Sequence, residues 1–119
     1  MKIEDKCSKA KNLDKINSVK RDQVKKIIKH VEENDDIGLI KKIIIFGSST
    51  RSDCTEKSDI DICVVSSLDS SKLKVFKHMY IVGAFSDVSG ENCDTIEYKY
   101  ADSFLRNTID TNGVCVYEL

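Results

Sequence analysis

Residues 43–65 read IIIFGSSTRSDCTEKSDIDICVV, and this stretch decides the fold. It completes an apolar run over residues 40–46, which predicts a buried central strand because such strands are covered on both faces. Gly47 breaks the run. After a polar connection, residues 60–65 resume the apolar pattern and predict a second strand. Two buried strands are therefore joined by a segment that carries the polar residues.

The polar connection begins with features that suit a phosphate group. Gly47 directly follows a strand, where a glycine lets the backbone turn sharply and lets a ligand approach closely. Ser48 and Ser49 supply hydroxyl and N–H groups at the expected start of a short helix, where unpaired N–H groups and the helix dipole favour phosphate. Arg51 adds a permanent cation with a fork that fits phosphate oxygens. The predicted nucleotide-phosphate site consists of Gly47, Ser48, Ser49 and Arg51.

The same connection ends in two carboxylates. Asp59 and Asp61 are two residues apart at the expected start of the second strand, so their side chains should share one face. Two carboxylates this close repel each other unless a cation lies between them, and Mg²⁺ takes a couple of protein carboxylates together with phosphate oxygens and water. Gly-Ser turns and Asp-x-Asp pairs are each common in solvated loops. Together, ten residues apart between two apolar strands, they favour a metal and phosphate site.

A third carboxylate is expected on a neighbouring strand. Asp94 is the preferred candidate because it opens the alternating run of residues 93–98, which predicts a strand. Glu97 should lie on the opposite face of that strand, and Glu91 belongs to the preceding turn. The predicted catalytic and metal-binding residues are Asp59, Asp61 and Asp94.

Working outward, apolar residues recur at helical spacing from Ser18 to about residue 34. Lys20, Lys25 and Lys29 are assigned to the opposite face, which is interpreted as a solvated face rather than a phosphate-binding one. Residues 1–17 are polar and are expected to form a tail or a loose helix ahead of a domain at residues 18–119.

Further helices are expected at residues 73–83 and 102–109, and a last strand at residues 114–117. Helices and strands that alternate in this way predict an α/β (α+β) single domain in which a mixed β-sheet is flanked by helices, with the helices on one face.

The composition is that of one soluble globular domain. The chain has 119 residues and a formal net charge of -1, which does not favour direct binding of nucleic acid. It has neither a membrane-length apolar run nor a secretory signal. Its five cysteines are scattered without a CxxC pair, which argues against a disulfide framework or a structural zinc site and favours the cytoplasm.

The order of an apolar strand, Gly47-Ser48, ten residues and Asp59-Ile60-Asp61 resembles the signature of the DNA polymerase β-like nucleotidyltransferase superfamily. The short length, Arg51 and the ending from Cys93 onward resemble its minimal nucleotidyltransferase branch. The resemblance implies a nucleotidyltransferase fold, two Mg²⁺ ions, ATP or another NTP as substrate, and attack of an acceptor hydroxyl on the α-phosphate. Thr95 after Asp94 departs from the apolar residue that is usual there.

Three functions follow from the resemblance. Minimal members are often encoded beside a HEPN ribonuclease and resemble antitoxins that adenylylate a tyrosine of that toxin, which implies AMP transfer to a partner protein. The alternatives are an antitoxin that neutralises a HEPN partner by binding, with little or no catalysis, and a stand-alone enzyme that modifies a small molecule. Because the chain carries no second domain, the surface for the acceptor should come from a partner or from a second copy.

Overall fold

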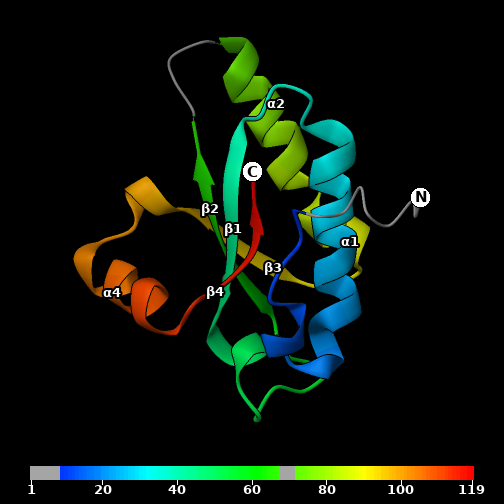
Figure 1. The fold of residues 1–119 in the computed structure, drawn as a ribbon, viewed down its shortest axis with the longest axis vertical. Coiled ribbons are helices and arrows are strands. Elements are labelled where there is room, and N and C mark those ends of the chain that lie inside the picture. The colour runs from blue at the N-terminus through cyan, green and yellow to red at the C-terminus, as the bar shows by residue number, and fades with distance from the viewer. Residues whose placement is uncertain (1–8, 68–71) are drawn as a thin grey trace.

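The computed structural model describes residues 9–67 and 72–119, which form one sheet with helices packed against it (Figure 1). The elements follow the predicted order, with a short additional helix, α3. The helices are α1 (Ser18–Asn34), α2 (Lys72–Gly83), α3 (Phe85–Ser89) and α4 (Ser103–Asn112). The strands are β1 (Ile40–Phe46), β2 (Ile60–Ser66), β3 (Cys93–Glu97) and β4 (Val114–Glu118). Short 3₁₀ turns span Leu13–Lys15, Gly47–Thr50 and Tyr98–Tyr100.

The sheet is mixed and has the strand order β3-β2-β1-β4. β1 pairs antiparallel with both β2 and β4, whereas β2 and β3 are parallel. Because side chains alternate along a strand, the register assigns every residue of β2 to one of two faces. Ile62 pairs with Ile45, and Asp61 pairs with Asp94, so these two pairs lie on opposite faces.

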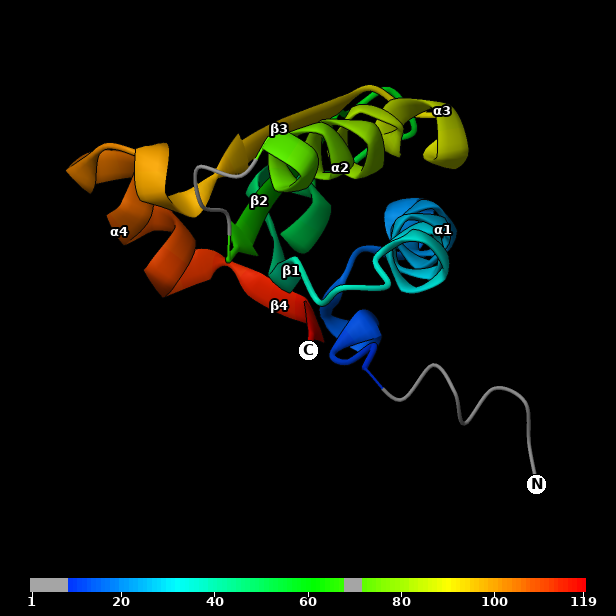
Figure 2. The ribbon, with the colours of Figure 1, turned by 90° about the horizontal axis from the view of Figure 1, so that it is seen from above.

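One face of the sheet, called here the helical face, is covered by α1, α2 and α3 (Figure 2). The residues that β1 and β2 contribute to this face are almost completely buried, at 0–1% exposure. Those residues are Ile43, Ile45, Ile60, Ile62 and Val64. Val24, Ile27 and Val31 of α1 pack into the same core. Asn17 caps α1 by accepting from the Val19 N–H, and the Asp35 carboxylate accepts from the N–H groups of Leu39 and Ile40, which orients the entry into β1.

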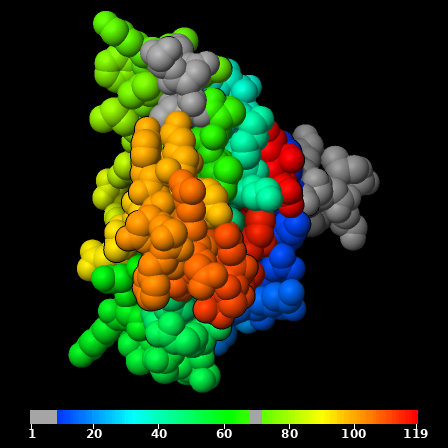
Figure 3. Space-filling view, turned by 90° about the vertical axis from the view of Figure 1, so that its left-hand side faces the viewer, coloured from blue at the N-terminus to red at the C-terminus, as the bar shows by residue number. Residues whose placement is uncertain are grey.

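The other face, called the site face, contains Asp61, Asp94 and Ile96, and α4 lies against part of it. Figure 2 shows α4 on the side of the sheet away from α1, and Figure 3 shows the orange segment that includes α4 spread over this face. The expectation that all helices lie on one face is therefore wrong. The apolar residues of α4 are too few to predict which side of the sheet it contacts.

Residues 9–17 pack on the domain. Ile16 belongs to the main core, the Lys11 N–H donates to the Val116 carbonyl at 2.8 Å, and the Arg21 guanidinium donates to the Leu13 and Ile16 carbonyls. The expected boundary after residue 17 therefore does not separate two packing units among the described residues, although one helical turn does occur there. Residues 1–8 lie outside the described part.

Two side-chain positions are unusual for their residue types, and the first differs from the sequence analysis. Lys20 is only 1% exposed, because it shares the spacing of Val24, Ile27 and Val31 on the buried side of α1. On α2 most of the large apolar side chains face outward, and the buried residue of this helix is Ile81. Four large apolar side chains of α2 are 63–74% exposed: Leu73, Phe76, Met79 and Tyr80.

Within residues 9–67 and 72–119, no helix is long and apolar enough to cross a membrane. Cys54, Cys63, Cys93 and Cys115 are all free thiols. Burial raises the pKa of the Cys63 thiol to about 12, so this cysteine remains protonated and serves as a small core residue.

Candidate active site

Asp61 and Asp94 form the centre of the candidate site. They are direct register partners on the adjacent parallel strands β2 and β3, so their carboxylates project from the same face of the sheet. Both line a small cavity of about 190 Å³, together with Phe46 at the end of β1, Ile96 and Leu105 of α4. Asp94 is exposed and Asp61 is half-buried. The arrangement places one carboxylate at the surface and one beneath it.

The electrostatics of Asp61 show that the carboxylates are crowded. Burial raises the pKa of Asp61 above its ordinary value, and the nearby charges of Asp94 and Asp59 raise it further, whereas Arg51 opposes the shift. Folding therefore brings negative charges together at a place where water screens them poorly. A bound cation would remove this repulsion, which is the behaviour expected of carboxylates that bind a metal.

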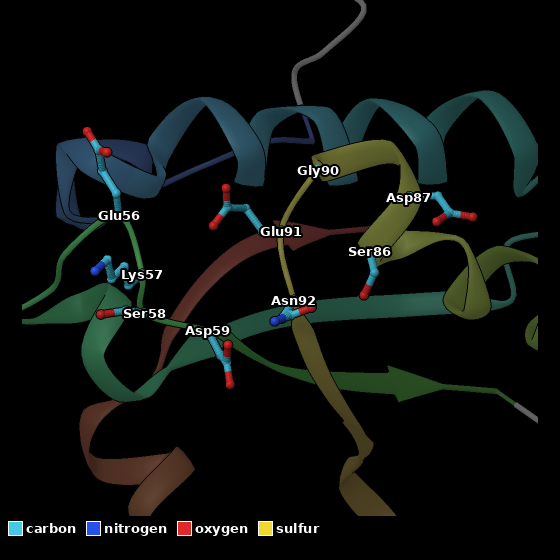
Figure 4. Close-up of a pocket in the computed structure, with 9 residues that line it drawn as sticks. All are labelled: Glu56, Lys57, Ser58, Asp59, Ser86, Asp87, Gly90, Glu91 and Asn92. Carbon is cyan, nitrogen blue, oxygen red and sulfur yellow. The ribbon is translucent and has the colours of Figure 1, made fainter.

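Asp59 stands apart from this pair. It precedes β2 instead of lying within it, and its exposed side chain lines a separate pocket of about 540 Å³ (Figure 4). In Figure 4 Asp59 points away from α1, whereas Glu91 points toward it. The sequence analysis expected Asp59 and Asp61 to share one face at the start of the second strand; β2 begins at Ile60, as predicted, and Asp59 directly precedes it.

The carboxylates suit Mg²⁺, although they do not form a complete metal site by themselves. Among the residues that the structure describes, no three His, Cys, Asp or Glu side chains are grouped closely enough to hold a metal by themselves. Mg²⁺, however, is usually held by one or two carboxylates, with phosphate oxygens and water as its other ligands. The crowded pair Asp61 and Asp94 supplies such ligands, and Asp59 is near enough to raise the pKa of Asp61. The residues therefore fit a cation that arrives with a nucleotide.

The Gly47 turn lies directly against the carboxylates. Gly47 has φ +73°, a left-handed conformation that favours glycine, and a Cβ at this position would overlap the Asp61 carboxylate. The turn is a single 3₁₀ segment rather than the start of a longer helix, and it is closed by the Thr50 hydroxyl, which donates to the Gly47 carbonyl at 2.8 Å. Glycine is thus required by both the backbone conformation and the proximity of Asp61.

The two serines of the turn have different positions. Ser48 is partly exposed, whereas Ser49 is completely buried and its hydroxyl has no hydrogen-bond partner among the described atoms. The Ser49 carbonyl accepts from the Asn17 N–H at 2.7 Å. Ser49 therefore anchors the turn to the start of α1, and its side chain is not presented to a ligand.

Arg51 lies beside a pocket of about 430 Å³ that also includes Gly47 and Thr50. Its guanidinium is exposed and pairs with Asp53 at 3.0 Å. The pocket is also lined by four residues that the sequence analysis did not identify: Lys15, Thr108, Asn112 and Val114. Two cations, Arg51 and Lys15, therefore flank a hollow next to the Gly47 turn. No local pattern predicts Lys15, because its position depends on the docking of residues 9–17.

The other acidic candidates are engaged elsewhere. Glu97 lies on the helical face, where it pairs with His78 at 3.3 Å and accepts from the Ser66 N–H. Burial opposes ionisation of Glu97, but the hydrogen bonds from His78 and Ser66 outweigh it and hold its pKa below the ordinary value. Glu91 forms an ion pair with the buried Lys20. Of the three alternatives considered for the third carboxylate, Asp94 is the one beside Asp61.

Comparison of the sequence with known proteins identifies a family and a relative. A family model described as polymerase beta, nucleotidyltransferase matches residues 25–119 of the chain. A protein of Methanocaldococcus jannaschii that is named as a candidate protein adenylyltransferase is 62% identical over 79 residues. The matched region covers 65% of this chain and 79% of that protein.

Similar folds are found among solved structures. A chain of a toxin–antitoxin complex with AMP-PNP is 22% identical, with a TM-score of 0.61, over 80% of this chain and 73% of that chain. A chain from a complex of a tri-AMPylated Shewanella oneidensis HEPN toxin with an MNT antitoxin is 21% identical, with a TM-score of 0.57, over 84% and 73% respectively. At these identities the likeness establishes the shared fold alone.

Proposed function

The chain belongs to the polymerase beta nucleotidyltransferase family, and from this premise we propose that it transfers AMP from ATP to a hydroxyl group of a partner protein. The observation that carries the proposal is the in-register pair of Asp61 and Asp94 beside the tight Gly47 turn. A metal-dependent transfer from a nucleoside triphosphate requires carboxylates that hold the metal and, close to them, a turn that can bind phosphate.

In the proposed reaction, the acceptor oxygen forms a bond to the α-phosphorus while the bond from that phosphorus to the oxygen bridging the β-phosphate breaks. Pyrophosphate leaves, and the hydroxyl proton passes to a carboxylate. Asp94 is the candidate for this general base because it is exposed next to Asp61. The β- and γ-phosphates would bind at the Gly47 turn, with Ser48, Arg51 and Lys15 as neighbours.

Asp61 and Asp94, with Asp59 as a further ligand, would hold Mg²⁺, and two ions are proposed. When bound, the ions neutralise the carboxylates and stabilise the negative charge that develops on the phosphate oxygens. The raised pKa of Asp61 supports this assignment, because burial and the neighbouring charges of Asp94 and Asp59 raise it, and a bound cation would offset that repulsion.

The size of the cavity beside Asp94, the proposed general base, supports a macromolecular acceptor. The cavity between Asp61, Asp94 and Leu105 has about 190 Å³, whereas pockets that enclose small ligands usually have about 300–1,000 Å³. A protein loop that presents a tyrosine hydroxyl would supply its own walls. The names of the relatives, a protein adenylyltransferase and MNT antitoxins in complexes with HEPN toxins, support a HEPN-type protein as the acceptor.

A second candidate function is neutralisation of that partner by binding, with little catalysis. The outward face of α2 favours it, because four large apolar side chains form a continuous exposed stripe on one helix. Exposed apolar patches of this kind often mark protein interaction sites. The stripe is compatible with both functions, so only the chemistry of the complex separates them.

The test uses the chain, labelled ATP, Mg²⁺ and the product of the gene next to its own, which the proposal expects to be a HEPN-type protein. We expect a mass increase of one AMP group on a tyrosine of the partner, detected by peptide mass spectrometry and abolished by EDTA or by Asp61→Asn. A stable complex without adduct would favour neutralisation by binding. Modification of a small hydroxylated compound by the chain alone would favour a stand-alone enzyme.

A further inference from the structure

A buried lysine lies beneath the connection that leads to Asp59. Lys20 of α1 is 1% exposed, and its ammonium group donates to the Glu56 carbonyl at 2.9 Å and forms an ion pair with the Glu91 carboxylate. These partners are 36 and 71 residues away in the sequence. Lys20 therefore joins α1, the connection before β2 and the segment before β3 through one ammonium group.

Both partners of Lys20 flank the candidate site. Glu56 lies three residues before Asp59, on the connection that links the Gly47 turn to β2. Glu91 precedes Asn92, whose carbonyl accepts from the Ile60 N–H at 2.9 Å at the point where β2 and β3 begin to pair. Figure 4 shows Glu56 at one side of the pocket that contains Asp59, and Glu91 between it and the α3 residues Ser86 and Asp87. One ammonium group thus contacts both segments that lead into the parallel strands, in addition to the backbone hydrogen bond between Ile60 and Asn92.

Stability alone is a poor explanation for this arrangement. Removing a lysine and a carboxylate from water is expensive, and replacing a buried ion pair with apolar residues of similar volume is often neutral or stabilising. A methionine at position 20 could fill the same space beside Val24 and Ile27. A methionine, however, has no donor for the Glu56 carbonyl and the Glu91 carboxylate, whereas the ammonium group binds both through charge-assisted hydrogen bonds.

We propose that Lys20 is a positioning residue for the transfer reaction: by holding Glu56 and Glu91 together, it fixes Asp59 relative to the pair Asp61 and Asp94. The proposal rests on the proposed function of these carboxylates. Lys20 itself does not touch the substrate, because its side chain is buried behind the loop and does not line the pocket that contains Asp59.

The experiment compares Lys20→Met, the double variant Lys20→Met/Glu91→Met, and Lys20→Arg, with Lys29→Met on the exposed side of α1 as the matched control. Three quantities are measured: the urea midpoint of unfolding, amide hydrogen exchange of residues 55–60, and the affinity for Mn²⁺ in the presence of AMP-PNP. Where transfer is observed, its Mg²⁺ dependence is measured as well.

We expect Lys20→Met to lower the urea midpoint, because it leaves Glu91 without its partner, and the double variant to restore the midpoint. The double variant should nevertheless exchange residues 55–60 faster and bind Mn²⁺ roughly tenfold more weakly, the scale at which groups behind metal ligands act. Lys20→Arg should recover part of the affinity, and Lys29→Met should match the wild type.

A double variant with wild-type exchange and wild-type Mn²⁺ affinity would overturn the proposal and leave Lys20 as a purely structural residue. This outcome differs from failure of the proposed function. If the wild-type chain transfers no AMP, hydrogen exchange and Mn²⁺ binding still report whether Lys20 orders the Asp59 connection.

Discussion

β2 presents isoleucine and valine to one side of the sheet and aspartate to the other. On the helical face, Ile60, Ile62 and Val64 are completely or almost completely buried under α1–α3. On the site face, Asp61 is half-buried next to the exposed Asp94, with the Gly47 turn and α4 beside them. The two faces of this strand therefore have different roles. The packed helical face stabilises the fold and makes the strand rigid, and the rigid strand keeps the crowded carboxylates at fixed positions on the site face.

The two carboxylates of β3 give the most direct test of this division. Asp94 faces Asp61, whereas Glu97 faces His78 on the opposite side. Asp94→Asn should lower the rate of AMP transfer roughly 10²–10³-fold, the usual loss when a group that stabilises charge in the transition state is removed. Its nucleotide affinity should change little. Glu97→Gln should transfer AMP at close to the wild-type rate, as measured in single-turnover assays with labelled ATP.

If the two variants behaved in the reverse way, the register between β2 and β3 would have to be shifted by one residue, because such a shift exchanges the faces. Circular dichroism of both variants provides the control that each one is folded.

Apolar residues of the two faces should differ in stability instead of activity. Ile62→Ala leaves a cavity in the packed core and should lower the free energy of unfolding by about 3–4 kcal/mol. Ile96→Ala, on the partly exposed wall of the small cavity, should lower it by only about 1–2 kcal/mol. Urea unfolding monitored by circular dichroism measures both values. Equal losses would mean that α4 covers the site face as tightly as α1–α3 cover the helical face.

Two glycines with the same backbone conformation refine the comparison. Gly47 and Gly90 have φ +73° and +74°, but a Cβ at position 90 would meet no atom within 4 Å, whereas one at position 47 would overlap Asp61. Gly90→Ala should lower the free energy of unfolding by about 1 kcal/mol through backbone strain alone. Gly47→Ala should lower it by about 2–3 kcal/mol and weaken AMP-PNP binding in calorimetry. A Gly47→Ala variant with normal affinity would remove the turn from the phosphate site.

The smallest effect concerns pH. The folded-state pKa of Asp61 is raised above 3.8, so its contribution favours folding at low pH and is lost as the pH rises through the folded-state value. The folded-state pKa of Glu97 is lowered below 4.5, so its contribution is present at neutral pH and is lost as the pH falls.

In EDTA, Asp61→Asn should therefore be more stable than the wild type near about pH 7 and converge with it near about pH 3. Glu97→Gln should be less stable near about pH 7, and the difference should shrink in acid. Urea titrations across this range measure both differences. A pH-independent difference for Asp61→Asn would contradict the crowding of the carboxylates.

The sequence predicted the elements that depend on local pattern. The strands β1 and β2 and the helix α1 lie at the expected residues. A strand that is buried on both faces has a continuous apolar run, and a helix that is buried on one face has apolar residues at helical spacing. The Gly47 turn and Asp61 were identified for the same reason, since their positions follow from where the strands end and begin. Asp59 directly precedes β2, so strand alternation does not set the direction of its side chain.

Side-chain direction was harder to predict than the elements themselves. The apolar residues of α2 indicated a helix correctly, but Leu73, Phe76 and Tyr80 face outward. Lys20 was assigned to a solvated face, although its spacing from Val24 and Ile27 places it inside. In both cases the residue type predicts a side-chain direction opposite to the observed one. For Lys20, the partner that stabilises the buried position is Glu91, which is distant in the sequence.

By itself, the sequence determined the strands, the Gly-Ser turn and the aspartates that the candidate site uses, because strand and turn signals extend over only a few residues. Tertiary structure alone decided that Asp94 stands opposite Asp61, that α4 lies on the site face, and that Lys20 meets Glu91. Each of these depends on contacts between segments that are tens of residues apart, and their energies depend on burial and register, which no local pattern encodes.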